Sequence, residues 1–399
     1  MQKNKTYIDS GYFEQYGLKL DTRRVQSRLF ITACFDRQAD LQATEFLFSK
    51  LVAILKEHAA IAVHIRCFGS GREHLLWQQM PQTPDRLNRC VTYIEGKSGD
   101  HFPASGIEIE AVIPDANLTF PTEIYNSDGK VIGCRFTEYD NKFVILQNIC
   151  AETLSDDYET QTAEVLHSAE TALRNEGMTF NNVLRTWFYL DEILSWYPKF
   201  NSVRTEFFRQ NGLTDSRNGD GCMLPASTGI QGKNANGAGC TLDLVAVMSG
   251  DESLLEVKRL TNVKQKDAFR YGASFSRATL LTSTGYSELQ LSGTASIDEA
   301  GVSKFVGDVE SQIANTLDII GSLLNSAGFT FDDIASASVF LKHANDLPVF
   351  ENILAARHLQ SLPFVLCNAD VCRDDLLFEM DGIAAKQIIC FISSKKSVI

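Results

Sequence analysis

Two stretches of the chain, GMTFNNVLRTWFYL (residues 177–190) and GFTFDDIASASVFL (residues 328–341), repeat one pattern in the same order. Each begins with a glycine, passes through a Thr-Phe pair and two Asn or Asp residues, and ends in an apolar, strand-like run. A glycine at this place can take the left-handed conformation that ends a helix, and the Phe that follows can return to the core. The pattern therefore predicts a helix that ends near Gly177 or Gly328 and leads directly into a buried strand.

The sequence around this joint extends it into a module that occurs three times. Each copy has an amphipathic helix, then an apolar strand, and later a final strand that carries an acid. The predicted helices cover residues 43–59, 162–178 and 308–328. The predicted strands that follow them cover residues 60–68, 181–190 and 332–341. The predicted final strands cover residues 106–113, 240–248 and 376–385.

The acids of the final strands, Glu108, Asp243 and Glu379, are almost evenly spaced, which predicts that they occupy matching positions. Each copy also opens with strand-like sequence, and copies two and three contain a second helical pattern at 193–212 and 346–360. The predicted fold is therefore α+β, with three modules that each place helices on one face of a mixed sheet. The predicted domains are residues 1–125, 126–255 and 265–392, with linkers near 114–135 and 249–270.

Composition excludes several classes of function. The chain has 399 residues and a net charge of −13, and it shows no Lys/Arg cluster, so we expect no nucleic-acid partner. No signal-peptide pattern or membrane-spanning run is present, and the ten cysteines show no C-x-x-C pair, which favours a cytoplasmic protein with reduced thiols. The histidines are scattered, so we expect neither a metal site nor another cofactor.

One further stretch is unusual for a buried segment. NADVCRDDLLFEMDGIAA (residues 368–385) is strand-like at its end, yet Glu379 lies inside the apolar run, and Cys372 and Arg373 lie shortly before it. A carboxyl flanked by Leu377, Phe378 and Met380 is desolvated, which raises its pKa and lets it donate a proton at neutral pH. The alternative is that Glu379 is a structural acid held in an ion pair, and the same alternative applies to Glu108 and Asp243.

These segments resemble the Rid (YjgF) family and, more closely, its chorismatase relatives. The blocks that carry the resemblance are LRTWFYL (184–190), LPASTGI (224–230), FSRATLL (275–281), LSGTASI (291–297), GDVESQIANTLDII (307–320) and ADVCRDDLLFEMDG (369–382). Simple Rid proteins are homotrimers with sites in the clefts between subunits. The resemblance therefore implies three Rid-like or chorismate-mutase-like modules arranged as a pseudo-trimer within one chain.

The resemblance also implies a chemistry. Chorismatases cleave the enolpyruvyl ether of chorismate into pyruvate and a dihydrodiol acid or hydroxybenzoate, and Glu379 matches the acid that protonates the vinyl carbon. Cys372 would lie beside the ring and influence the product. The expected substrate-binding residues are Arg373, Arg277, Arg204, Tyr189, Trp187, Gly293 and Thr294, with the arginines as clamps for carboxylates.

The sequence departs from the related patterns at several places. Rid imine hydrolases carry an Arg before the final strand, whereas this chain has Val371 at that position, which disfavours imine deamination. The chorismatase pattern Trp-Asn-Tyr reads Trp187-Phe188-Tyr189 here, and a Val-Gly-His stretch is replaced by DEAGVSKFV (298–306). The loss of polar contacts favours a more apolar substrate than chorismate.

Three functions therefore stay open at this point. The first is a chorismatase-like enzyme that acts on a small molecule without a cofactor. The second is a cyclase or aromatase that acts on a β-keto polyketide chain of the dialkylresorcinol type, with an acyl carrier protein as its partner. The third is a Rid-like ligand-binding protein without enzymatic activity. Each would be a monomer or a small homo-oligomer without a membrane partner.

Overall fold

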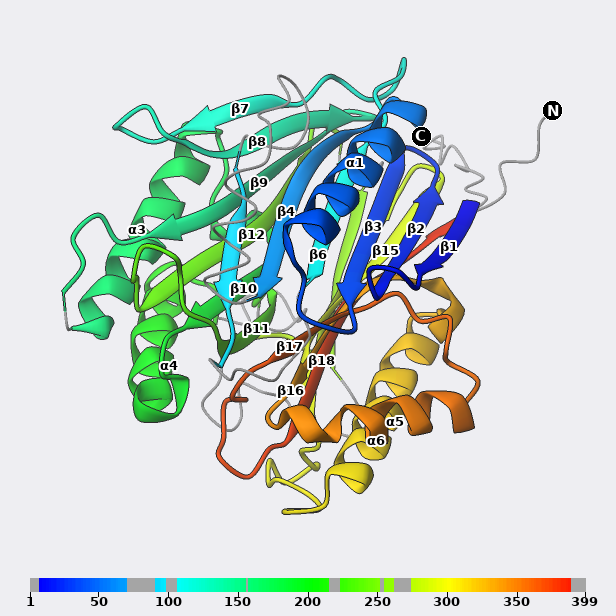
Figure 1. Cartoon of the computed structure of the whole chain (residues 1–399). Helices are drawn as coiled ribbons and strands as arrows, with labels where there is room; N and C mark the ends of the chain where they lie inside the picture. Colours follow the sequence, from blue (N-terminus) through cyan, green and yellow to red (C-terminus); the bar gives the residue numbers. More distant parts are fainter. Residues whose placement is uncertain are drawn as a thin grey trace, which may run out of the picture.

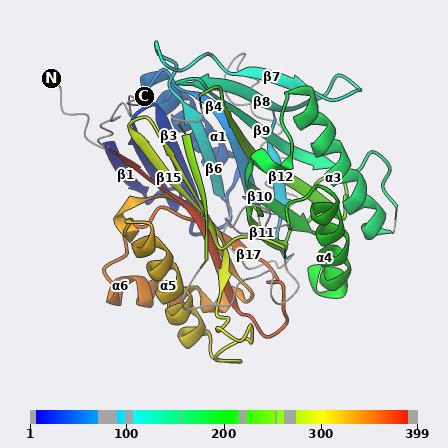
Figure 2. The same cartoon turned by 180° about the vertical axis from the view of Figure 1, so that it is seen from behind.

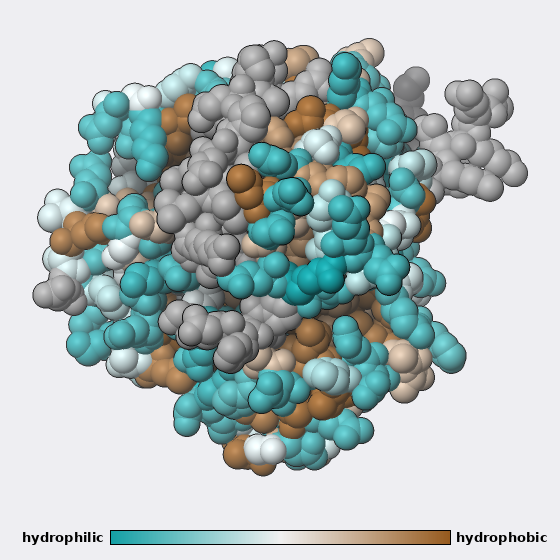
Figure 3. Space-filling view, in the orientation of Figure 1, coloured by the Kyte–Doolittle hydropathy of each residue, from teal (hydrophilic) through white to brown (hydrophobic). Residues whose placement is uncertain are grey.

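The chain folds into three sheets with helices on their outer faces, in a computed structural model (Figures 1 and 2). The structure describes residues 7–69, 90–97, 106–155, 157–214, 223–251, 255–261 and 274–388. In these residues no helix is long and apolar enough to cross a membrane. On the face shown in Figure 3, hydrophobic residues form separate patches among hydrophilic ones, as on an ordinary protein surface.

The first sheet has the order β1-β2-β3-β6-β4-β5. Its strands are β1 (Tyr7–Phe13), β2 (Leu18–Val25), β3 (Arg28–Phe35), β4 (Ile61–Gly69), β5 (Thr92–Glu95) and β6 (Gly106–Val112). Helix α1 (Leu41–Glu57) connects β3 to β4 and begins at Asp40, whose side chain accepts a hydrogen bond from the Ala43 N–H.

The second and third sheets repeat this order as β7-β8-β9-β12-β10-β11 and β13-β14-β15-β18-β16-β17. The second contains β7 (Thr122–Tyr125), β8 (Val131–Glu138), β9 (Asn141–Cys150), β10 (Val183–Leu190), β11 (Ala226–Gln231) and β12 (Cys240–Ser249), with α3 (Tyr158–Asn175) and α4 (Ile193–Gln210). The third contains β13 (Leu255–Leu260), β14 (Ala278–Ser283), β15 (Tyr286–Ala295), β16 (Ile334–Leu341), β17 (Val365–Asn368) and β18 (Phe378–Gln387), with α5 (Val309–Ser326) and α6 (Leu347–Ala356).

The helix–strand joints have the predicted geometry. Gly177 follows α3 with φ 76°, and Gly328 follows α5 with φ 75°, both in the left-handed region that favours glycine. Short 3-10 turns then lead into β10 and β16. Phe180 returns to the core as predicted, whereas the equivalent Phe331 is half-buried and the neighbouring Phe329 is buried instead. The predicted α+β fold of three mixed-sheet modules is confirmed.

The predicted linkers contain strands. The region near 114–135 includes β7 and the start of β8, and the charged region 249–270 includes β13, which is an edge strand of the third sheet. The sheets therefore span residues 7–112, 122–249 and 255–387. The predicted domain boundaries at 125/126 and 255/265 remain a prediction.

The pairing register corrects the predicted match between the three acids. Each module has a β-bulge near the start of the strand that follows its first helix. The bulges lie at Val63 in β4, Leu184 in β10 and Ala335 in β16. Counted from these bulges, Glu108 pairs with Arg66, Asp243 pairs with Trp187, and the third acid in that place is Asp381, which pairs with Ser338. Glu379 lies two residues earlier, at the position of Gly106 and Thr241, because residue spacing does not set register.

The three sheets pack around a shared interior in which equivalent residues meet. Phe68, Tyr189 and Phe340 are equivalent in register, and the Phe68 ring lies edge-on to the other two, with ring centres 6.5 and 6.3 Å apart. The next layer contains Arg66 and Trp187, with the guanidinium carbon of Arg66 4.5 Å from the indole centre. Each sheet thus buries its second face against the other two modules.

Buried polar contacts close the ring between all three pairs of modules. Arg28 donates to Glu138 at 2.9 Å between the first and second modules, and Arg185 donates to Asp381 at 2.9 Å between the second and third. Ser338 donates to Glu108 at 2.9 Å between the third and first. The chain is therefore an intrachain pseudo-trimer, as predicted.

Candidate functional site

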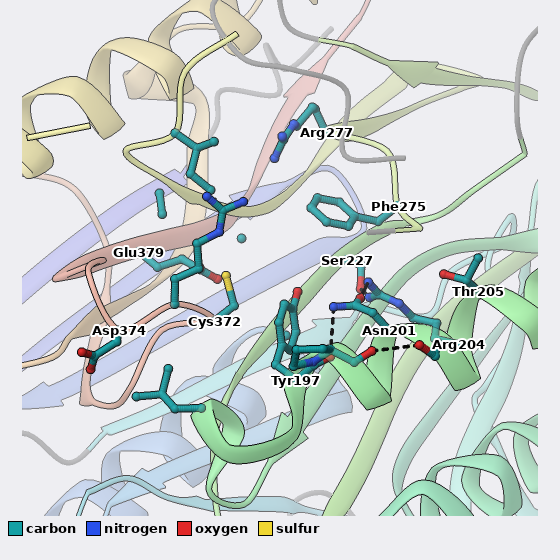
Figure 4. A pocket seen from close by; sticks show the side chains of 18 of the residues that line it. Tyr197, Asn201, Arg204, Thr205, Ser227, Phe275, Arg277, Cys372, Asp374 and Glu379 are labelled. Carbon is teal, nitrogen blue, oxygen red and sulfur yellow. Dashed lines mark hydrogen bonds between the residues drawn. The ribbon is translucent and has the colours of Figure 1, made fainter. Parts of the chain in front are cut away.

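A cavity of about 690 Å³ lies between the second and third modules (Figure 4). Its walls come from α4, β11, β15, the segment before β14, the loop between β17 and β18, and the start of β18. It has the size of an ordinary small-molecule site. The predicted site residues among its lining are Glu379, Cys372, Arg373, Arg277, Arg204 and Gly293.

Glu379 lies at the inner end of this cavity and is 4% exposed. Its carboxyl group occupies the space beside Gly293, where a Cβ atom would lie well under 3 Å from Oε1. Within the described part of the chain, no hydrogen bond or ion pair to this carboxyl was found. The absence of a side chain at Gly293 therefore makes room for the acid.

The surroundings of Glu379 favour its protonated form. Burial, and after it the Asp381 carboxylate, raises the pKa of Glu379 from the ordinary 4.5 to about 8, against the lowering effect of Arg185 and Arg277. A carboxyl group with this pKa is mostly protonated at neutral pH. It can therefore donate a proton into the cavity, which is the condition that the sequence argument required.

Two buried arginines line the cavity on either side of Phe275. The guanidinium carbons of Arg204 and Arg277 lie 5.7 and 5.3 Å from the centre of this ring, and both residues are at most 2% exposed. Arg204 also donates to Asn201 Oδ1 at 2.6 Å. A planar guanidinium held in this way can bind a carboxylate bidentately.

Arg373 and Cys372 enter the cavity from the loop before β18. Arg373 donates to the Gly301 carbonyl oxygen at 2.9 Å, so it also holds the loop that follows β15. Figure 4 shows the Cys372 sulfur beside Glu379. Burial raises the pKa of Cys372 to about 12 despite the lowering effect of the neighbouring Arg373, so the group is a neutral thiol rather than a thiolate.

Three predicted substrate-binding residues are not part of the cavity wall. Trp187 and Tyr189 face the shared interior, since alternate residues of β10 point there, and Thr294 donates to the Ser292 carbonyl oxygen within β15. Their predicted contact with substrate is therefore not supported by their position.

The sequence argument missed several polar residues of the cavity wall. Tyr197 and Asn201 lie on the same face of α4 as Arg204, and Ser227 of β11 accepts a hydrogen bond from Arg204 at 3.3 Å. The spacing 197, 201, 204 follows one helix face and was available in the sequence. It became informative only once the structure placed that face against the third module.

Comparisons with known proteins agree with this architecture. The family model described as Endoribonuclease L-PSP matches residues 267–386. A RutC family protein of Sulfurisphaera tokodaii is 32% identical over 100 residues, which make up 25% of this chain and 79% of that protein. The chain belongs to the Rid/YjgF (L-PSP) superfamily.

Within this superfamily the chain is similar to chorismatases. A chorismatase of Streptomyces rapamycinicus is 27% identical over 226 residues, which make up 52% of this chain and 65% of that protein. A 3-hydroxybenzoate synthase of Streptomyces hygroscopicus is 27% identical over 235 residues, with the same 52% and 65% coverage. The match to these relatives thus spans 65% of their length.

A crystal structure of a chorismatase supports the shared fold. It aligns with a TM-score of 0.58 and 20% sequence identity, covering 81% of this chain and 93% of that one. This Rid-superfamily chain and the chorismatase therefore share their overall arrangement.

The three modules of this Rid-superfamily chain carry different residues at the position of Glu379. The register places Gly106 and Thr241 where the third module has Glu379. The carboxyl group that can act as an acid thus belongs to the cleft between the second and third modules. In the described residues, no group of three or more His, Cys, Asp or Glu side chains could hold a metal ion.

Proposed function

We propose that the chain is a chorismatase-like enzyme in which Glu379 protonates the enolpyruvyl group of a cyclic acid. The observation that carries the proposal is the buried carboxyl group at the inner end of the cavity between two modules, which has no ion-pair or hydrogen-bond partner among the described residues. Its similarity to chorismatases supports the same reaction. Chorismate or a close analogue is the proposed substrate.

The proposed reaction balances without a cofactor. Glu379 gives its proton to the terminal CH₂ carbon, which becomes a methyl group, and positive charge develops at the carbon that bears the ether oxygen. Water adds at that carbon and returns a proton to Glu379. The resulting hemiketal then breaks its bond to the ring oxygen, which releases pyruvate and a cyclic diol acid. Loss of one further water from this diol yields a hydroxybenzoate.

The charge around the cavity supports an anionic substrate. Arg204 and Arg277 lie on the two sides of Phe275, so they can contact two carboxylates of one small molecule. A neutral β-keto chain offers no anionic group to these two guanidinium groups, so it matches their charge less well. The charge of the cavity therefore favours cleavage of an enolpyruvyl acid over the cyclase or aromatase reaction. No feature of the described residues supports that second reaction.

Incubation with chorismate tests the proposal directly. We expect pyruvate, measured with a coupled lactate dehydrogenase assay, and an aromatic or diol acid, measured by chromatography. Glu379→Gln should lower the rate about 10²–10⁴-fold, the usual contribution of a general acid.

Glu170→Gln is the matched control, because this variant removes a carboxyl from the outer surface of α3, where Glu170 pairs with Arg174. It should retain the wild-type rate. Absence of pyruvate from the wild-type protein, or an equal rate for Glu379→Gln, would refute the proposed function.

A further inference from the structure

Two acids on one strand lie near the same buried cation, Arg185. Glu379 and Asp381 are two residues apart on β18, so their side chains point to the same side of the sheet. Arg185 reaches this side from β10 of the second module and is fully buried. The pairing that Arg185 adopts therefore decides which of the two acids forms an ion pair with it.

Arg185 forms an ion pair with Asp381 rather than with Glu379. Arg185 Nη2 lies 2.9 Å from Asp381 Oδ2, and the Thr228 hydroxyl donates to the same carboxylate oxygen at 2.6 Å. Arg185 also donates to Thr228 and to the Thr186 carbonyl oxygen, and its guanidinium carbon lies 4.4 Å from the Trp187 ring centre. These contacts come from β10 and β11, so the cation is held by the second module on several sides.

The other charged and titratable groups near Glu379 come from different elements than the Arg185–Asp381 pair. Arg277 approaches from the segment before β14, while Cys372 and Arg373 approach from the loop before β18. Thr228 lies next to the same space, since its methyl group would be 3.3 Å from a Cβ atom at Gly293. The Asp381 cluster therefore borders the pocket that holds the Glu379 carboxyl.

We propose that Asp381 is a positioning residue that occupies Arg185 and thereby leaves the carboxyl of Glu379 unpaired, neutral and turned into the cavity. The role in catalysis rests on the proposed function, whereas the effect on Glu379 does not. Arg185 with its charge uncompensated would attract the ionised form of Glu379. Asp381 and the equivalent Asp243 would then differ in role, since Asp243 is held by His64 and Thr92 and has Thr241 two residues before it.

Charge-neutral variants of the pair test this role through the pH profile of kcat. Wild-type activity should fall above about pH 8 as Glu379 ionises. In Asp381→Asn that fall should move down by about one to three pH units, the usual effect of an unbalanced neighbouring cation. Arg185→Gln should move it upward, and the double variant Asp381→Asn/Arg185→Gln should return it to within about one unit of the wild type.

Asp243→Asn is the control for a merely structural effect. It removes a buried carboxylate at the equivalent position of the neighbouring cleft, so it should leave the fall near pH 8. If Asp381→Asn does not fold, Arg185→Gln and the neutral double variant still test the role, because the fall should move upward in the first and stay within about one pH unit of the wild type in the second. An unmoved pH limb in folded Asp381→Asn, or an equal movement in Asp243→Asn, would overturn the proposal.

A spectroscopic measurement separates this inference from the proposed function. The infrared C=O band of protonated Glu379, isolated as the difference between wild type and Glu379→Gln, needs no substrate. It should disappear near pH 8 in the wild type and one to three pH units lower in the Asp381→Asn background. A band that titrates in this way without turnover of chorismate would sink the proposed function alone, whereas a band unaffected by Asp381→Asn would sink the inference.

Discussion

Replacement of Glu379 by Gln should make the folded chain more stable at alkaline pH. The carboxyl has a pKa of about 8 in the fold, mainly because burial disfavours its charge, against 4.5 for an ordinary glutamate. The folded chain therefore holds this proton over a window in which the unfolded chain has lost it. Stability falls as the pH rises from about 4.5 to about 8, and Gln, which is neutral at every pH, avoids this loss.

The expected size follows from the same two values. Each tenfold difference in proton affinity corresponds to about 1.4 kcal/mol, so the gap between 4.5 and about 8 amounts to about 5 kcal/mol. Below pH 4.5 the wild type and Glu379→Gln should have nearly the same free energy of unfolding. Above pH 8 the variant should be more stable by about 5 kcal/mol, an upper value because hydrogen bonds to Gln differ from those to Glu.

Urea denaturation at pH 5 and pH 9 measures this difference, with tryptophan fluorescence as the signal. Trp187 is well placed as a reporter because it lies in the interior shared by the three modules. Glu159→Gln in the exposed first turn of α3, where Glu159 pairs with Lys199, provides the control and should show no pH-dependent difference. Equal stability differences for Glu379→Gln at both pH values would show that Glu379 is not a buried, protonated acid, and the proton-donor argument would fail.

Three further predictions concern the cavity. Gly293→Ala should lower kcat about 10²-fold and change the urea midpoint little, because its Cβ displaces the movable Glu379 carboxyl rather than backbone; wild-type kcat would contradict this. Arg277→Gln should raise KM for chorismate about tenfold or more through the loss of a charge-assisted hydrogen bond, and an unchanged KM would remove Arg277 from the binding site. Cys372→Ser should leave the alkaline limb of the pH profile near pH 8, since the thiol pKa of about 12 lies far above that limb, and a displaced limb would implicate the thiol in proton transfer.

Local patterns were sufficient for the architecture. The repeated Gly-x-Thr-Phe joints predicted where α3 and α5 end, and periodicity predicted the helices and the strands that follow them. These features depend on residues within a few turns of each other. Edge strands such as β7 and β13 were taken for linkers, because short, half-exposed strands lack a distinctive apolar pattern.

The candidate site was only partly accessible in the same way. Glu379 was recognisable as an acid inside an apolar strand, and its two-residue offset from the equivalent acid left it on the same face of β18. The orientation of Trp187 and Tyr189 toward the interior depends on the bulge in β10 and on the packing of three sheets. No single segment carries that information.

The amino-acid sequence by itself determined the triple α+β repeat and the apolar neighbours that desolvate the Glu379 carboxyl, since both follow from residues that are close along the chain. Only the tertiary structure decided that Asp381, rather than Glu379, takes Arg185, and that the cavity wall includes α4 of the preceding module. These outcomes depend on strand register and on contacts between segments about 200 residues apart, which are settled when the three sheets pack around one interior.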